Sequence, residues 1–300
     1  MIEISGLTKK FDKITALDAL DLTVQNGSVT GLIGSNGGGK STLLRILAGV
    51  FRHDSGSVLI DGERPFDNPK IKGDCYFVSD YPFFYSDSTL SNTAALYRRL
   101  YPHWSEEEFE RCCAMFPIDR KQKILNMSKG MQRQAALIIA LSTCPKYLFL
   151  DEIFDGLDAV VRLVLKRLLA ERVDAQQMTV VIASHNLREL EDLCDNICLL
   201  HRGKVVVERD IDTLREDYRK VQIGFSQPQE DAIFEHVPVV GVWHSGNVFN
   251  LTLKGKEEDF MPQLEALQPA FISAMPLTLE EVFISETEVV GYDIKKFILS

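Results

Sequence analysis

The chain has 300 residues, of which 45% are hydrophobic and 25% are charged, and its formal net charge is -10. This profile is ordinary for a soluble globular protein, and without a cluster of lysine and arginine it argues against nucleic-acid binding as the main activity. The longest apolar runs, at residues 135–141 and 178–183, are too short to span a membrane. The six cysteines have no metal-ligand spacing, so we expect reduced thiols.

The first 80 residues combine short strands with one helix. Alternation or apolar runs predict strands at 2–4, 20–24, 29–33, 58–60 and 75–78. A helix is predicted at 41–48, where Gly49 is a typical residue to follow the helix C-terminus. Between the third strand and this helix lies the glycine-rich stretch GSNGGGKS.

Residues 82–145 have a helical pattern and are predicted to form a helical insertion. Ser105 and Glu108 fit a capping box, and Trp104 and Phe109 are spaced as a hydrophobic staple around it. A further helix starts at Ser128 in the stretch NMSKGMQRQ and ends before Pro145. Its first turn contains Gly130, although glycine costs about 1 kcal/mol there relative to alanine.

From residue 147 strands and helices alternate, which predicts a parallel sheet with helices on both faces. The expected strands are 147–150 and 179–183, the helices are 159–173 and 187–193, and a hairpin follows at 197–200 and 204–207.

After residue 217 we expect strands at 221–225, 239–243, 248–253 and 271–274, a helix at 255–267 and a capped helix from Thr278. The predicted domains are therefore 1–215, with its helical subdomain at about 82–145, and a small α+β domain at 216–300 that regulates or dimerises.

The stretch GSNGGGKS matches the phosphate-binding P-loop pattern, and its position between a strand and a helix supports the match. Glycines allow backbone N–H groups to surround a polyphosphate, and the helix N-terminus adds positive potential. Lys40 is expected to reach the β- and γ-phosphates, and the Ser41 hydroxyl to bind Mg²⁺. The predicted nucleotide-binding residues of this loop are Gly34, Ser35, Asn36, Gly37, Gly38, Gly39, Lys40, Ser41 and Thr42.

The stretch YLFLDE supplies the acidic element that a P-loop requires. Its carboxylates end a buried parallel strand, where side chains face the ligand crevice. We expect Asp151 to hold Mg²⁺ through water and Glu152 to orient and deprotonate the attacking water.

With these motifs the sequence resembles the nucleotide-binding subunit of an ATP-binding cassette (ABC) transporter. Three further stretches carry the resemblance in family order: MSKGMQ resembles the signature L-S-G-G-Q, DGLD the D-loop, and SH the switch histidine. Phe11 matches the aromatic residue that stacks on adenine. The resemblance covers residues 1 to about 210 and implies a P-loop NTPase fold with a RecA-like sheet, an antiparallel β subdomain and a helical subdomain.

The resemblance also implies that two cassettes pair head to tail and that each signature contacts the γ-phosphate bound by the other chain. The signature residues acting in trans would be Ser128, Lys129, Gly130, Met131 and Gln132. Gly130 would let backbone approach that phosphate. Asp158 would contact the partner's P-loop, although on its own it fits the N-cap of the following helix equally well. The implied catalytic residues are Glu152, His185 and Lys40, with ATP and Mg²⁺ as cofactors.

The sequence departs from the family pattern at four positions near the expected site, and two of them, Ser35 and Gly38, lie in the P-loop, where proline and alanine are common. Asp80 stands where glutamine is usual, and we expect it to join Ser41 and Asp151 at the metal; Ile153 stands where proline is usual. The aromatic stretch at 81–85 lies where relatives receive the membrane partner, and it fits either a docking surface or a subdomain core.

The expected partners are a second ABC subunit and an integral membrane permease, with the protein in the cytoplasm at the inner face of the membrane. Two alternatives remain open: a soluble ABC-type ATPase in translation or DNA repair, and a nucleotide-binding regulator without useful turnover. The tail stretch LTLEEVFI resembles that of cassettes serving separately encoded exporter-type permeases.

Overall fold

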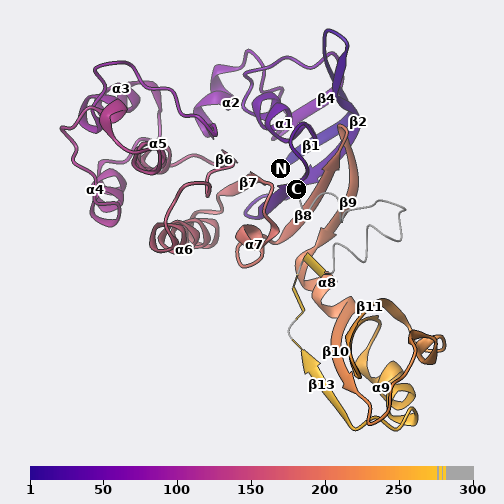
Figure 1. Ribbon diagram of the computed structural model, residues 1–300. Coiled ribbons are helices and arrows are strands. Elements are labelled where there is room, and N and C mark those ends of the chain that lie inside the picture. Colours follow the sequence, from indigo (N-terminus) through magenta and orange to yellow (C-terminus); the bar gives the residue numbers. More distant parts are fainter. Residues whose placement is uncertain (276, 279, 282–300) are drawn as a thin grey trace. The chain divides into compact units, whose positions relative to one another are not determined.

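The structure is a computed structural model that describes residues 1–275, 277–278 and 280–281. It divides into two units, Met1–Glu208 and Arg209–Ser300 (Figure 1). The division falls within strand β9 (Lys204–Asp210), whereas the sequence pattern places the boundary after residue 215. Within the described ranges, no helix combines the length and the apolar character needed to cross a bilayer.

The first unit contains an antiparallel sheet with strand order β2-β1-β4. Strands β1 (Ile2–Phe11), β2 (Ile14–Val24) and β4 (Ser55–Ile60) are longer than predicted. The pairing of β1 with β2 shifts register between Ile4 and Leu7 and twice more before the turn. These irregularities break the apolar alternation, so the sequence marked only the regular ends of the strands.

A mixed sheet in the order β5-β6-β7-β3-β8-β9 forms the centre of this unit. Its first five strands run parallel: β5 (Cys75–Val78), β6 (Tyr147–Asp151), β7 (Thr179–Ser184), β3 (Val29–Ile33) and β8 (Asn196–His201). Every residue of β3, β6 and β7 is buried, which explains their continuous apolar runs. The carboxyl ends of β3, β6 and β7 lead to the P-loop, to Glu152 and to His185, so the topology brings these three segments to one edge.

Helix α1 (Lys40–Leu47) buries Leu43, Leu44 and Leu47 in a core shared by the antiparallel and the mixed sheet. The unit also contains α2 (Pro69–Asp74), α6 (Ala159–Gln176) and α7 (Leu187–Leu190). Helix α2 was not predicted, since it is a single short segment that begins at the cap Asn68 with proline at its first turn. The apolar core between the sheets fixes the P-loop at its helix end.

The helical insertion consists of α3 (Leu90–Leu100), α4 (Glu106–Met115), a short 3₁₀ turn (Ile124–Asn126) and α5 (Lys129–Ser142). These helices gather at one side of the first unit in Figure 1. Ser105 caps α4 as predicted, and the rings of Trp104 and Phe109 lie 5.6 Å apart. The reciprocal half of the capping box is not formed within the described part of α4, because the Glu108 carboxylate accepts a hydrogen bond from Arg172 at 2.5 Å instead.

The second unit is the expected α+β arrangement, an antiparallel sheet in the order β11-β12-β10-β13. Its elements are α8 (Ile211–Asp217), β10 (Tyr218–Gly224), a 3₁₀ turn (Asp231–Phe234), β11 (Val239–Ser245), β12 (Val248–Lys254), α9 (Glu257–Ala266) and β13 (Phe271–Met275). Alternate residues of β12, Phe249, Leu251 and Leu253, share one core with Phe260 and Leu264 of α9. Most of the helix predicted from Thr278 lies outside the described residues.

Candidate functional site

The backbone of the P-loop approaches neighbouring segments so closely that side chains are excluded. A Cβ atom on Gly34 would overlap the carbonyl oxygen of Leu200, and one on Gly39 would lie 2.7 Å from the carbonyl oxygen of Ala16. Gly39 also has φ +109 at the N-cap of α1, a conformation that other residues rarely adopt. The glycines therefore seat the loop against β2 and β8 as well as leaving its N–H groups accessible.

Replacing Gly34 with alanine is expected to cost more stability than replacing Gly37. Gly37 has φ +81 but no heavy atom within 4 Å of its hypothetical Cβ, so alanine there costs only backbone strain, about 1–2 kcal/mol. At Gly34 the methyl group meets a backbone carbonyl that cannot move without displacing β8. Thermal unfolding of the two variants tests this, and equal midpoints would contradict it.

Lys40, at the first position of α1, is 5% exposed and points back into the loop. Its Nζ donates to the carbonyl oxygens of Gly34 at 2.5 Å and Ser35 at 3.4 Å, and it lies 3.5 Å from Oε1 of Glu152. Burial lowers the pKa of Lys40, and the charge of Glu152 opposes that change. The ammonium group thus has the carbonyl oxygens of the glycine-rich loop on one side and a carboxylate on the other.

Ser41 and Asp151 form the part of the site that fits a cation. Ser41 Oγ donates to Oδ1 of Asp151 at 2.9 Å, and Asp151 is only 1% exposed. Burial raises the pKa of the Asp151 carboxyl, and its Oδ2 is buried with no hydrogen-bond partner among the described residues. An unpartnered carboxylate oxygen beside a hydroxyl is the hard oxygen donor set that Mg²⁺ prefers.

Glu152 adopts φ +48, which is unusual for a residue other than glycine and typical of strained functional positions. The Glu152 side chain lies between Lys40 of the P-loop and the segment that contains His185. Oε1 faces Lys40, while Oε2 accepts a hydrogen bond from the backbone N–H of His185 at 3.2 Å and lies 2.8 Å from His185 Nδ1. The resemblance identifies His185 as the switch histidine, and in this structure its backbone N–H and its ring contact the Glu152 carboxylate.

These side chains border a cavity of 330 Å³, which is lined by Ile14, Ala16, Ser35, Asn36, Gly37, Gly38, Gly39, Lys40, Ser41, Thr42, Asp80 and Glu152. The apolar residues Ile14 and Ala16 were missed, because the sequence pattern predicted this strand only from residue 20, whereas β2 begins at Ile14. Phe11 is not among the lining residues, and its ring packs against Phe51 with centroids 5.5 Å apart. The structure thus gathers the P-loop, Asp80 and Glu152 around one cavity and leaves Phe11 beside it.

The signature turn is well formed but lies outside this cavity. Ser128 caps α5 by accepting a hydrogen bond from the backbone N–H of Met131 at 3.2 Å, and Gln132 donates to the carbonyl oxygen of Met127 at 3.0 Å. Lys129 is exposed. A Cβ on Gly130 would lie 2.7 Å from the carbonyl oxygen of Gly156, so a close contact within one chain already requires glycine there.

Two acidic residues named in the sequence analysis have hydrogen-bond partners within this chain. Asp158 is the N-cap of α6 and accepts a hydrogen bond from the backbone N–H of Val161 at 2.9 Å. Asp80 borders the cavity, but its carboxylate accepts a hydrogen bond from Arg133 Nη2 at 2.5 Å. No sequence motif marked Arg133, since an arginine in a helix normally indicates a solvent-exposed surface.

Comparison with known proteins agrees with the family resemblance that the motifs indicated. A family model described as ABC transporter matches residues 17–155. The ABC transporter ATP-binding protein YtrB of Bacillus subtilis is 30% identical over 95% of this chain and 98% of its own length. The bacitracin transport ATP-binding protein BcrA of Bacillus licheniformis is 29% identical over 73% of both chains.

Two solved structures are similar to a large part of this chain. The ATP-binding subunit of an ABC transporter superposes with a TM-score of 0.66 at 26% identity, covering 72% of this chain and 92% of its own. A bacterial ABC transporter cassette solved as a dimer gives 0.64 at 25% identity, covering 70% and 99%. With a near full-length relative and a P-loop site in place, the chain belongs to the ABC transporter family as an ATP-binding and ATP-hydrolysing subunit.

Proposed function

We propose that two cassettes, this chain and either a second copy or a related chain, close head to tail around two molecules of MgATP. The observation that carries this proposal is that the P-loop residues and the signature turn of one chain do not line the same cavity. Lys40, Ser41 and Glu152 line the P-loop cavity, whereas the exposed signature turn at Ser128 and Lys129 is not among its lining residues. A signature that does not reach its own nucleotide site is suited to complete the site of another chain.

Within each site, Ser41 and Asp151 would hold Mg²⁺, which when bound supplies positive charge to the β- and γ-phosphates. Lys40 exchanges its bonds to the loop carbonyls for the phosphate oxygens and neutralises part of their charge. The free Oδ2 of Asp151 and the hydroxyl of Ser41 support this arrangement.

Glu152 is placed to act as the general base. In the proposed step a water oxygen bonds to the γ-phosphorus, the water proton passes to Glu152, and the bond from that phosphorus to the bridging oxygen breaks to give ADP and phosphate. His185 holds Oε2 of Glu152 by the contacts described above and so orients the carboxylate. This places Glu152, Lys40 and His185 in one catalytic unit.

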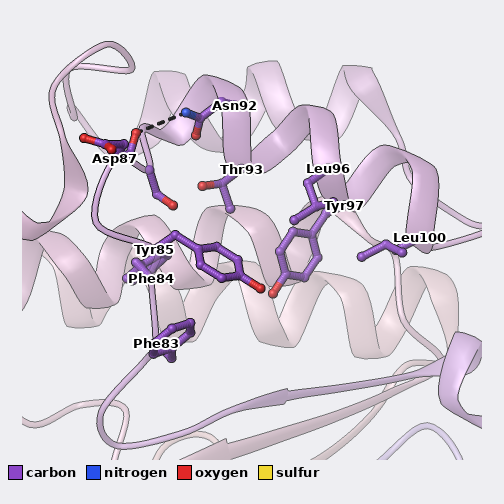
Figure 2. Close-up of a pocket in the computed structure, with 10 residues that line it drawn as sticks. Phe83, Phe84, Tyr85, Asp87, Asn92, Thr93, Leu96, Tyr97 and Leu100 are labelled. Carbon is purple, nitrogen blue, oxygen red and sulfur yellow. Dashed lines mark hydrogen bonds between the residues drawn. The ribbon is translucent and has the colours of Figure 1, made fainter.

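The membrane partner is proposed to dock on an aromatic groove of the helical subdomain. This groove has a volume of 440 Å³ and is lined by residues of the 83–100 segment (Figure 2). Phe83 is 79% exposed and Tyr85 is 68% exposed, and their rings lie 5.3 Å apart. Figure 2 shows Tyr85 and Tyr97 directed toward one another across the groove. Exposed aromatic groups that gather around a hollow indicate an interaction surface, here for an integral membrane permease that keeps the protein at the inner face of the membrane.

Replacing Phe83 and Tyr85 together with serine is expected to lower recovery of the protein with membranes that contain its permease by about tenfold or more, because the apolar contact is lost. Co-sedimentation of the chain with such membranes measures the effect. Phe66→Ser is the matched control, because Phe66 is an exposed aromatic residue of the same unit outside the groove. Equal losses in both variants would contradict the assignment.

The experiment that tests the paired cassettes is the molecular mass of the protein in solution, with and without MgATP, when hydrolysis is blocked at Glu152. An ATP-dependent dimer supports the proposal, and a monomer under all nucleotide conditions rejects it for this chain alone.

A further inference from the structure

Arg133 of α5 joins three segments of the first unit through one guanidinium group. It is 8% exposed. Its Nη2 donates to Oδ1 of Asp80 at 2.5 Å and to the Asp80 carbonyl oxygen at 3.2 Å, and its Nη1 donates to the carbonyl oxygen of Asp155. A planar guanidinium can satisfy such a divergent set of acceptors, whereas a lysine cannot.

Direct backbone packing tightens the same junction. The hypothetical Cβ of Gly130 meets the carbonyl oxygen of Gly156 at 2.7 Å, and that of Gly156, which has φ +70, meets Arg133 Nη1 at 3.0 Å. The first turn of α5 therefore rests on the loop that follows Glu152 with no side chain between them. Two surfaces in such contact cannot shift separately without opening a gap or a clash.

Each acceptor of Arg133 leads to a different part of the site. Asp80 borders the nucleotide cavity together with Glu152. The backbone N–H of Asp155 donates to the backbone carbonyl oxygen of Glu152 at 3.3 Å, so the third segment is joined to the backbone of the proposed general base. At the other end, Arg133 lies in the same helix as Ser128, which caps α5.

We propose that Arg133 is a positioning residue that locks the signature turn to Asp80 and to the loop after Glu152. A change at the nucleotide cavity of one chain then moves its signature, which acts on the partner's nucleotide. This inference rests on the proposed function, because only a paired cassette gives Ser128 a nucleotide to contact. It assigns Asp80 as the counter-charge of Arg133 rather than as a ligand of Mg²⁺.

The charge arrangement favours this assignment over metal binding. The side chain of Arg133 is 10% exposed and that of Asp80 30% exposed, so their pairing is largely shielded from water. Drawing the carboxylate to a cation would leave the guanidinium charge buried without its partner, which is strongly unfavourable. The guanidinium would also repel a divalent cation at the same oxygen.

A double-mutant cycle tests the assignment. The variants are Asp80→Ala, Arg133→Met and both together, and the measured quantities are kcat and the Mg²⁺ concentration for half-maximal ATPase rate. We expect each single change to lower kcat by about 10–100-fold, as for other groups that orient catalytic residues, with the double variant no slower than the slower single variant. Half-saturation by Mg²⁺ is expected to stay unchanged.

Two reference variants show what loss of a metal ligand and loss of an unrelated ion pair each do to the ATPase. Asp151→Asn shows what loss of a metal ligand does, a rise in the Mg²⁺ requirement. Arg120→Met removes another arginine–carboxylate pair of the helical subdomain, with Glu110 at 2.6 Å, and is expected to leave the rate unchanged. A rise in Mg²⁺ requirement for Asp80→Ala like that of Asp151→Asn, or losses that multiply in the double variant, would overturn the proposal.

Arg133→Lys is the second variant, to be used if Arg133→Met does not fold. Lysine keeps the positive charge but lacks the planar guanidinium group that donates to several acceptors at once. We expect this variant to bind ATP as the parent chain does, to hydrolyse it about tenfold more slowly and to dimerise more weakly when Glu152 is replaced by glutamine. A wild-type rate for Arg133→Lys would overturn the role of Arg133. If the Glu152→Gln chain shows no ATP-dependent dimer, the proposed pairing of two copies of this chain fails. A normal dimer, together with effects of Asp80→Ala and Arg133→Met that multiply in the double variant, rejects only the role of Arg133.

Discussion

Replacing Glu152 with glutamine is expected to abolish steady-state ATP hydrolysis while ATP binding is retained. The amide keeps the shape of the side chain and can still contact His185, but it cannot accept the proton of the attacking water. General bases of this kind contribute about 10²–10⁴-fold to a rate. The expected product is a chain that accumulates as a MgATP-bound dimer, because the step that opens the dimer is blocked.

The measurement combines phosphate release with the mass of the protein in MgATP. Glu171→Gln is a matched control, because that carboxylate is 54% exposed and pairs with Arg111 on the surface. We expect the control to hydrolyse ATP normally and to show no trapped dimer. Hydrolysis by the Glu152→Gln chain at the wild-type rate would show that another group is the base.

Replacing Lys40 with methionine is expected to lower kcat/KM for ATP by about 10²–10³-fold, by analogy with the loss of one preorganised donor. Methionine approximates the length of the lysine side chain in this buried position and leaves no large cavity. The decrease in kcat/KM therefore measures the loss of the ammonium charge. Methionine also leaves the Gly34 carbonyl oxygen without the bond that Nζ donates to it. The P-loop should therefore bind nucleotide more weakly as well as hydrolyse it more slowly.

Nucleotide affinity and initial rates, measured on the same preparation, separate these two effects. Lys70→Met provides the control, since Lys70 is 73% exposed and its ion pair with Glu63 lies on the surface. Wild-type affinity together with a wild-type rate in the Lys40→Met chain would contradict the proposed phosphate cradle.

Local sequence patterns correctly predicted the strands whose residues are mostly buried in the core. Strands β3 and β5 begin and end where the sequence placed them, since each is a short apolar run in a parallel sheet. The helices α2 and α8 escaped prediction, because each is short and its cap, Asn68 or Asp210, is also a common turn residue. Burial over many residues leaves a readable sequence pattern, and these two helices have only six and seven residues.

The P-loop composition revealed the candidate site, but not how its side chains are held. The left-handed backbone of Glu152 and its contact with His185 join residues from different strands, and no local pattern encodes them. Gly130 shows the opposite case, because one glycine satisfies both an expected approach to phosphate and an observed contact with Gly156. A substitution of Gly130 therefore disturbs both the contact with Gly156 and the expected approach to phosphate. A substitution of Ser128 separates the expected phosphate contact from that packing, because the Ser128 side chain only caps α5 in this structure.

The most direct test of the account is a structure of the Glu152→Gln chain in complex with MgATP. The account predicts two chains in which Ser128 and Gly130 of each lie against the γ-phosphate held by Lys40 of the other. A complex in which the signature turns lie far from both nucleotides would contradict it, and the chain would then bind ATP without sharing its sites.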